Sequence, residues 1–379
     1  MKPCAIVGIG RTAYSRNSGR TTLAMGAEAS RAALADAGLD PADIDGISTF
    51  QNNDSALGHL VAHAIGIDDL TWNCSFQGGG NQTASVVATA ASVIQAGLCR
   101  AVVVYRSLNG RSGYRHGSRT GPMEVDGEWQ FDAPQGYLVP PQWLAMFARR
   151  HQMVYGSTCE DLGQIAITQR GHAAANPHAV ARQPITMDDY LAGRWVNEPF
   201  RVYDCSYEVD GAVAIVLAGE EMARKSTRDP VWLAAAAESH AGTGWDQWDD
   251  MTTMYSREAG PRLWKRSGLQ PSDVDVACLY DCFTYTVMAT MEDFGFCEKG
   301  EVGDYFAEGR ATYGGDVVVN PHGGLLSEGY IHGLNHHFEA VLQLRGDAGP
   351  RQVAGAGVAL VSAGAGPYGG ANILTAEKP

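Results

Sequence analysis

The chain has 379 residues, of which 45% are hydrophobic, 9% aromatic and 18% charged, and its length suits two or three globular domains. This composition excludes disordered, collagen-like and coiled-coil chains. Acidic residues outnumber basic residues by 42 to 28, and the formal net charge of −14 argues against a nucleic-acid partner.

The first residues and the cysteines suggest the cellular compartment. Met1–Ser15 contains a short apolar run interrupted by glycines, which matches neither a signal peptide nor a membrane-spanning helix. The eight cysteines are scattered and include no C-x-x-C pair, so reduced and mostly buried thiols are expected. We therefore expect a cytoplasmic protein that does not cross a membrane.

Strand and helix patterns alternate over the first hundred residues. Apolar runs predict strands at Ala5–Ile9, Ile44–Phe50 and Ala101–Tyr105, and helical patterns fall at Thr21–Ala37, His59–Ile67 and 81–96. Gly38 closes the first helix, since glycine readily adopts the left-handed conformation at helix ends. The alternation predicts an α/β fold in which helices cover both faces of a mainly parallel sheet.

Residues from about 107 to 195 break this rhythm and predict an inserted loop or cap domain. Within it, helical patterns occur at Gln142–Tyr155 and Glu160–Ala174. Strand patterns return at Val213–Leu217, after the turn signal Asp210-Gly211, and at Val231–Ala235.

An internal repeat at a constant offset of 230 residues organises the chain. Residues 33–45 match residues 263–275, and the identical positions are Gly38, Leu39, Pro41, Asp43 and Asp45, which recur as Gly268, Leu269, Pro271, Asp273 and Asp275. A helix, a glycine cap, a proline turn and a strand are thus used twice. We expect two homologous α/β halves, 1–220 and 221–379, with the insertion in the first.

Two glycine motifs resemble a dinucleotide-binding fingerprint but lack its context. Gly8-Ile9-Gly10-Arg11-Thr12-Ala13 follows a strand, yet Ser15 to Gly19 separate it from any helix that could hold a pyrophosphate. Gly364–Gly369 fits the pattern too close to the end of the chain for the required helix and acidic residue. We expect neither to bind a cofactor.

Two further features have both a functional and a structural interpretation. His332 and His336 have the i, i+4 spacing of metal ligands, with His322 and His337 nearby, but the ligand set is incomplete and a structural or substrate-facing cluster is favoured. The run Gly78–Gly80 before a helix suits either ligand binding through backbone N–H groups or a tight turn.

Together these features resemble the thiolase superfamily. The resemblance rests on the duplicated halves and on four ordered motifs, which are Gly38-Leu39-x-Pro41-x-Asp43-Ile44-Asp45, Asp210–Ala214, Asp281-Cys282-Phe283 and Asn320-Pro321-His322-Gly323-Gly324. The nearest branch is that of the sterol-carrier-protein thiolases and their lipid-transfer-protein relatives. The resemblance implies a thiolase fold, in which two βαβαβαββ-type halves form five αβαβα layers.

The catalytic cysteines of thiolases are missing from this chain. The position of the nucleophile falls at Gly79 or Gly80, and that of the second cysteine falls within 362–366, around Gly364. Cys74 lies upstream, on the preceding strand, and is expected to be a buried thiol. Without these thiolates, covalent acyl transfer has no nucleophile.

Tyrosines stand where thiolases have polar catalytic residues. Tyr280 replaces the Asn or His before the acidic residue of the Asp281 motif, and Tyr330 replaces the His of the Gly-His-Pro motif. This pattern resembles the retro-aldolases of bacterial steroid side-chain degradation, which release a ketosteroid and propionyl-CoA from a β-hydroxyacyl-CoA. The resemblance implies a lyase that needs neither a metal nor a nucleophile.

The expected roles follow from that reaction. One of Tyr280 and Tyr330 deprotonates the steroid hydroxyl and the other protonates or stabilises the enolate, and their order stays open. Because a free phenol has a pKa near 10, the base needs help, for which His332, His322 and Asp281 are the candidates. Substrate or oxyanion binding is expected at Gly79, Gly80, His322 and Gly364.

The resemblance also implies a separate partner with a zinc ribbon and an OB-fold, which helps to hold the acyl-CoA and joins a homodimer in a heterotetramer. Any zinc would belong to that partner. Two alternatives are a non-catalytic carrier of acyl-CoA or lipid, and an acetyl-CoA acyltransferase-like thiolase that uses Cys74.

Overall fold

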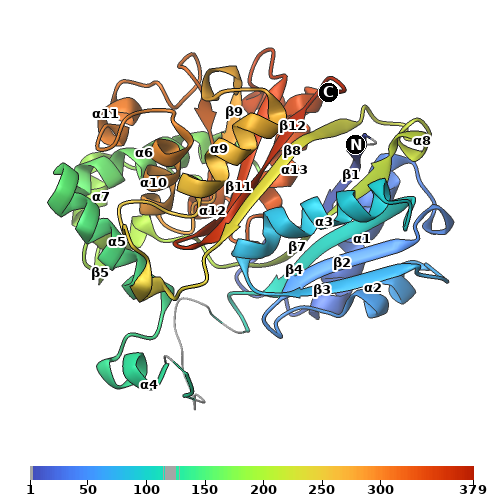
Figure 1. Cartoon of the computed structure of the whole chain (residues 1–379), viewed down its shortest axis with the longest axis horizontal. Helices are drawn as coiled ribbons and strands as arrows, with labels where there is room; N and C mark the ends of the chain where they lie inside the picture. Colours follow the sequence, from blue (N-terminus) through green and yellow to red (C-terminus); the bar gives the residue numbers. More distant parts are fainter. Residues whose placement is uncertain (1–2, 114, 116–124, 128) are drawn as a thin grey trace.

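The computed structural model describes residues 3–113, 115, 125–127 and 129–379 (Figure 1). The main elements before residue 220, leaving out the insertion, are β1 (Cys4–Arg11), α1 (Thr22–Ala37), β2 (Gly46–Gln51), α2 (Gly58–Ile65), β3 (Trp72–Gln77), α3 (Thr83–Gln95), β4 (Ala101–Asn109) and β7 (Asp210–Gly219). The insertion contains α4 (Trp129–Asp132), α5 (Pro140–Tyr155), α6 (Cys159–Ala174), α7 (Met187–Ala192), β5 (Trp195–Asn197) and β6 (Phe200–Arg201). The two helices predicted there are confirmed as α5 and α6.

The remaining elements follow from residue 220 onwards. They are α8 (Glu220–Ala223), β8 (Val231–His240), α9 (Ser256–Ser267), β9 (Val276–Cys278), α10 (Thr284–Phe294), α11 (Val302–Ala307), β10 (Val318–Val319), α12 (Gly324–Ser327), α13 (Leu334–Arg345), β11 (Val358–Ala365) and β12 (Tyr368–Thr375). Among the described residues, no helix has the length and apolar character that crossing a membrane requires.

The sequence repeat is confirmed as a structural repeat. Helices α1 and α9 end at Gly38 and Gly268, whose φ angles of 68° and 71° are both left-handed. Each glycine is followed by a short 3-10 turn that begins with a proline, Pro41 or Pro271. The next element is β2 in the first half and β9 in the second. The same local signals therefore built the same helix, turn and strand twice.

The ten-stranded sheet is mixed rather than mainly parallel as predicted, since five of its nine strand pairings are antiparallel. It has matching strand orders on its two sides. From the middle outwards the order is β1-β7-β4-β2-β3 on one side and β8-β12-β11-β9-β10 on the other. The sides join where β1 and β8 pair antiparallel, with Ala5 opposite Trp232. Each strand of the first half therefore has a counterpart at the same position in the second half.

The helices complete five layers. Helices α3 and α13 each contact strands of both halves, so they form the middle layer. Helix α1 packs on β1, β7 and β4, and α9 packs on β8 and β12, on the outer faces. Figure 1 shows the two halves side by side with α3 and α13 between them. The predicted αβαβα arrangement is confirmed.

The two glycine motifs have structural roles. A Cβ atom at Gly8 would lie 2.1 Å from the carbonyl oxygen of Ala33, and one at Gly10 would lie 2.1 Å from that of Ala29. These glycines therefore let α1 pack directly against β1. The second motif forms the tight connection between β11 and β12, where Ala365 pairs with Tyr368.

Candidate active site

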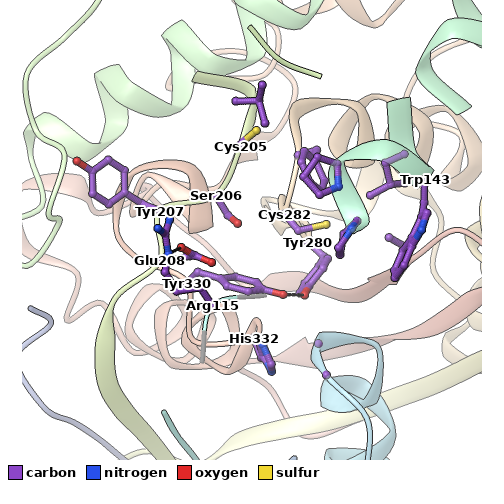
Figure 2. Close-up of a pocket in the computed structure, with 18 of the residues that line it drawn as sticks. Arg115, Trp143, Cys205, Ser206, Tyr207, Glu208, Tyr280, Cys282, Tyr330 and His332 are labelled. Carbon is purple, nitrogen blue, oxygen red and sulfur yellow. Dashed lines mark hydrogen bonds and ion pairs between the residues drawn. The ribbon is translucent and has the colours of Figure 1, made fainter. Parts of the chain in front are cut away.

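A cavity of about 1030 Å³ is lined by residues of both halves and of the insertion (Figure 2). Six of the eight predicted site residues line it, namely Gly79, Gly80, Tyr280, Tyr330, His332 and Gly364. The other two, Asp281 and His322, are fully buried and lie outside the lining. The structure therefore brings most of the predicted site together.

The two tyrosines meet at their hydroxyl groups. The hydroxyl oxygens of Tyr280 and Tyr330 are 2.7 Å apart, and the rings cross at 62°. Tyr280 follows β9, and its backbone N–H donates to Ser362 Oγ at 2.9 Å. The N–H of Tyr330 donates to the carbonyl oxygen of Tyr207 at 2.9 Å. Both phenols are thus fixed by backbone contacts, and Figure 2 shows them end to end at the cavity.

The two phenols differ in their electrostatic surroundings. Burial raises the pKa of Tyr280 well above its ordinary value, and the neighbouring Tyr330 and the Asp281 carboxylate raise it further. Burial also raises the pKa of Tyr330, but the hydrogen bond with Tyr280 and the charge of Arg106 oppose this rise. Of the two, Tyr330 is therefore the easier to ionise.

His332 is held by a buried arginine that sequence reasoning missed. The Nε and Nη2 atoms of Arg106 lie 3.2 and 3.0 Å from His332 Nδ1, and Nη2 also donates to Asp54 Oδ2 at 2.6 Å. A guanidinium has no acceptor, so Nδ1 accepts and the imidazole proton is on Nε2. The His332 ring centroid lies 4.8 Å from that of Tyr330. His332 is therefore a neutral hydrogen-bond donor beside the phenol pair.

Of the two positions at which the thiolase nucleophile could fall, residue 80 has no room for a side chain and residue 79 does. A Cβ atom at Gly80 would lie 1.8 Å from the Tyr280 hydroxyl oxygen, whereas one at Gly79 would be 3.5 Å from its nearest neighbour. A side chain at residue 80 and the Tyr280 hydroxyl therefore exclude each other. Gly78 has a φ of 143°, so this run forms a tight turn as well as part of the cavity.

Cysteines offer no evident replacement for the nucleophile. Cys74 is in β3 and does not line the cavity, and burial raises the pKa of its thiol. Cys205 and Cys282 do line the cavity, which the sequence did not predict. Burial raises the pKa of both thiols, so both stay protonated at neutral pH.

Asp281 and His322 form a buried polar layer outside the cavity lining, and the expectation that they assist the base stays a prediction. Asp281 accepts from the N–H groups of Leu325 and Leu326 at 2.8 and 3.2 Å. His336 connects the pair, with Nε2 3.2 Å from Asp281 Oδ1 and Nδ1 3.1 Å from His322 Nε2. Tyr280 lines the cavity, whereas the next residue, Asp281, faces the N–H groups of Leu325 and Leu326 instead.

The histidine spacing does not create a metal face. Helix α13 begins at Leu334, and His332 precedes it with a φ of 52°, so His332 and His336 do not share a helical turn. His336 instead lies within 4.8 Å of His322 and of Cys278, all buried. The hydrogen bond between the imidazoles and the raised pKa of Cys278, caused by burial, suit a hydrogen-bonded polar core.

Comparisons with known proteins place the chain among its relatives. Residues 237–375 match the family described as thiolase C-terminal domain-like. The chain is 40% identical to the "Steroid side-chain-cleaving aldolase" of Thermomonospora curvata, over 99% of this chain and 98% of that protein. It is 42% identical to the "17-hydroxy-3-oxo-4-pregnene-20-carboxyl-CoA lyase" of Mycobacterium tuberculosis, over 96% of each. The solved structure of the "Ltp2-ChsH2(DUF35) aldolase" superposes with a TM-score of 0.93 at 38% identity, covering 99% of this chain and 98% of that one.

Proposed function

The chain belongs to the family of the steroid side-chain-cleaving aldolases, and we propose that it cleaves a 17-hydroxy steroid side-chain CoA thioester by a retro-aldol reaction. The products are a 17-ketosteroid and propionyl-CoA. The observation that carries this function is the pair of phenols 2.7 Å apart on a cavity that holds no activated thiol among its described residues. Phenols transfer protons without becoming acylated, which is what this reaction requires.

Tyr330 is the proposed base. Its phenolate takes the proton of the tertiary hydroxyl, the C17–C20 bond breaks as the ketone forms, and the electron pair passes into the thioester enolate. Tyr330 suits this role because the charge of Arg106 favours its ionised form, while Asp281 opposes ionisation of Tyr280. Of the two orders that the sequence left open, we therefore propose this one.

Tyr280 is the proposed acid. It protonates the α-carbon of the enolate, which releases propionyl-CoA and leaves Tyr280 as the phenolate. Tyr330 now carries the substrate proton, and transfer across their 2.7 Å hydrogen bond restores both phenols to their starting states. The cycle therefore needs no external base.

The enolate oxygen requires hydrogen-bond donors. His332 is one candidate, because its Nε2 carries the proton and the residue lines the cavity beside Tyr330. The backbone N–H groups of Gly79 and Gly80 are the others, at the turn before α3. We propose that these groups hold the thioester oxygen as negative charge develops on it.

A DUF35-type partner is part of this proposal. The similar solved aldolase carries a DUF35 protein, ChsH2, in its name, and we propose an equivalent zinc-ribbon and OB-fold partner here, bound to a homodimer of this chain. Any zinc would be on that partner. No cofactor is proposed for this chain.

The test is an assay of the chain co-expressed with a DUF35 partner. We expect a 17-hydroxy steroid propionyl-CoA thioester to release propionyl-CoA and the 17-ketosteroid without added free CoA. Binding of the thioester without release would instead support the carrier alternative. Release that depends on free CoA would support the acyltransferase alternative.

A further inference from the structure

The two sides of the cavity differ in chemistry. On one side an aromatic wall is formed by Trp143 of α5, Trp245 of the segment before α9, and Tyr368 at the start of β12. The ring centroids are 5.7 Å apart for Trp143 and Trp245, and 6.3 Å apart for Trp245 and Tyr368. Pro140 and Leu144 extend this surface. The wall is thus broad and apolar.

The opposite side carries arginines, of which Arg16 donates to the Tyr207 hydroxyl group. The residues that line the cavity on this side include Tyr207, Glu208 and Arg115. The Nε atom of Arg115 donates to Glu208 Oε2 at 2.5 Å. Figure 2 shows Trp143 on one side of the phenol pair, and Tyr207, Glu208 and Arg115 on the other. The arginines that line the cavity are Arg16, Arg111, Arg115 and Arg194.

Negative charge lies close to the aromatic wall. The pKa of Tyr137, whose ring is 6.5 Å from that of Trp143, is raised to about 12 by burial and by the charges of Asp132 and Asp246. A phosphate-bearing ligand group is therefore disfavoured there and favoured at the arginines. The cavity has one side for an uncharged apolar group and one side for an anionic group.

Resting on the proposed function, we propose that the aromatic wall binds the fused rings of the steroid, and that Trp143 and Trp245 determine the preference for that nucleus. The bond that breaks joins the last steroid ring to the thioester arm. The phenols must therefore lie between the ring system and the CoA, which is where Tyr280 and Tyr330 lie. Fused apolar rings also bury a large area against a surface of neighbouring aromatic side chains.

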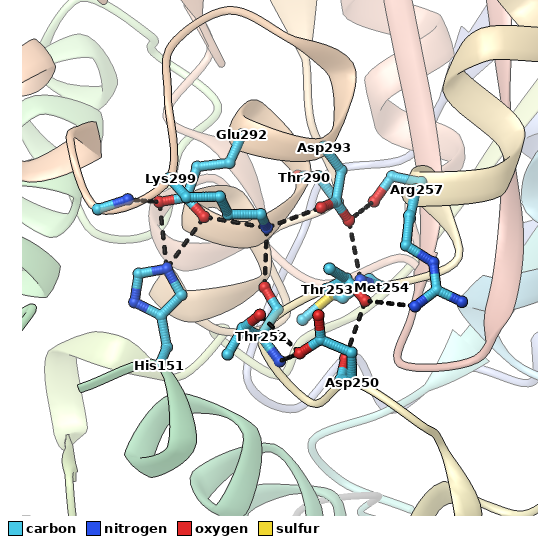
Figure 3. A network of polar contacts seen from close by, with 12 residues as sticks. His151, Asp250, Thr252, Thr253, Met254, Arg257, Thr290, Glu292, Asp293 and Lys299 are labelled. Atoms are coloured by element: carbon cyan, nitrogen blue, oxygen red, sulfur yellow. Dashed lines mark hydrogen bonds and ion pairs between the residues drawn. The ribbon is translucent and has the colours of Figure 1, made fainter. Parts of the chain in front are cut away.

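A buried polar network holds the two elements of the wall in place (Figure 3). His151 of α5 has its Nε2 3.0 Å from Glu292 Oε2 on α10. The segment that carries Trp245 is tied to the next residue of α10, since the N–H of Met254 donates to Asp293 Oδ2 at 2.8 Å. Glu292 and Asp293, adjacent residues of α10, thus hold both elements that carry the wall.

Lys299 completes this network. Its ammonium group lies 2.8 Å from Asp293 Oδ1 and 3.2 Å from Glu292 Oε2, and it donates to the carbonyl oxygen of Thr252 at 2.8 Å. Paired and hydrogen-bonded in this way, the buried acids form a fixed support. Rigid support of this kind reduces the ordering that ligand binding requires.

The wall is tested with two substrates that share the reacting bond. One is the 17-hydroxy steroid thioester, and the other is 2-(1-hydroxycyclopentyl)propanoyl-CoA, which keeps only the equivalent of the last ring. We expect Trp143→Ala and Trp245→Ala to lower kcat/KM for the steroid by at least about tenfold and to change it for the small analogue by less than about threefold. Met153→Ala, an exposed position on α5, is the control and should alter neither.

A second probe separates this inference from the proposed function. Binding of androst-4-ene-3,17-dione, followed by isothermal titration calorimetry, needs no turnover. We expect the wild-type protein with its partner to bind this ketosteroid, and both tryptophan variants to weaken binding by at least about tenfold. Ketosteroid binding without cleavage of either substrate would contradict the proposed function but not the proposal that the aromatic wall binds the steroid. Equal losses on both substrates, or unchanged ketosteroid binding in both variants, would overturn the wall.

Discussion

Gly80 lies so close to the hydroxyl group of Tyr280 that a Cβ atom at residue 80 would be 1.8 Å from the hydroxyl oxygen. The Tyr280 ring also packs on Gly333, whose own Cβ would lie 2.9 Å from it. The tyrosine is therefore confined between two glycines. A nucleophilic side chain could appear at residue 80 only if the phenol moved.

The Gly80→Ala variant tests this relationship. We expect it to fold and to lose about a hundredfold in kcat, because the methyl group displaces the Tyr280 hydroxyl by an ångström or more. Gly171→Ala is the matched control, since a Cβ atom there has no neighbour within 4 Å. Full activity in Gly80→Ala would show that the Tyr280 hydroxyl position does not matter to the reaction.

Removing either hydroxyl of the phenol pair should abolish most of the activity. For Tyr280→Phe and Tyr330→Phe we expect kcat to fall about a thousandfold, the usual size of a lost general acid or base, with ketosteroid binding retained. Tyr155→Phe, at a half-exposed position on α5, serves as the control. Propionyl-CoA release is measured by chromatography. Undiminished release in both variants would remove the tyrosines from the mechanism.

Much of the fold could be predicted from the sequence because its signals are local. Gly38 and Gly268 end helices, and the prolines that follow start turns, so the repeated motif predicted the repeated structure. The boundary near residue 220 and that of the insertion stay predictions. The insertion's strands β5 and β6 carried too few residues to give a recognisable pattern.

Sequence analysis predicted only those residues of the candidate site that belong to a recognisable motif. Tyr280 and Tyr330 lie fifty residues apart and were found through the family resemblance. Arg106 was missed, because its contact with His332 joins positions far apart in sequence that only the folded sheet brings together. Asp281 was placed in the site because it adjoins Tyr280, but its carboxylate is held by the N–H groups of Leu325 and Leu326 outside the cavity lining.

The proposed base predicts the pH dependence of the reaction. Burial raises the pKa of Tyr330 above its ordinary value, so the phenolate is a minor form at neutral pH. Below that pKa its fraction rises about tenfold per pH unit, and we expect kcat/KM to rise similarly between about pH 7 and pH 9. A rate that is flat over this range, measured when chemistry limits turnover, would contradict a phenolate base.

The cavity thiols should be unreactive. Burial raises the pKa of Cys205 and Cys282, so their reactive thiolate forms are scarce at neutral pH. We expect iodoacetamide at about pH 7.5 to leave activity unchanged over the time in which free cysteine is consumed. Mass spectrometry of the protein after turnover should reveal no acylated cysteine. An acyl group on Cys205, Cys282 or Cys74 would restore the acyltransferase alternative.

Two buried histidines outside the cavity should make the fold sensitive to acid. Burial lowers the pKa of both His172 and His337 from 6.5 to about 4. His172 Nδ1 lies 3.0 Å from the carbonyl oxygen of Val319, and His337 Nε2 lies 2.8 Å from Asn372 Oδ1. Because each pKa is depressed in the folded state, the stability that these neutral rings contribute is present above pH 6.5 and is lost as the pH falls towards 4.

Each pH unit between the unfolded and folded pKa values changes the free energy of unfolding by about 1.4 kcal/mol. We therefore expect a loss of about 2 kcal/mol of stability for each histidine between neutral pH and about pH 5. Urea unfolding at the two pH values measures it. His337→Gln should be less stable at neutral pH, because the ring leaves a cavity, but its stability should fall by about 2 kcal/mol less on acidification than that of the wild type. His240→Gln, at a partly exposed position, is the control and should keep the wild-type pH dependence. An unchanged pH dependence in His337→Gln would mean that this imidazole is not kept neutral by burial.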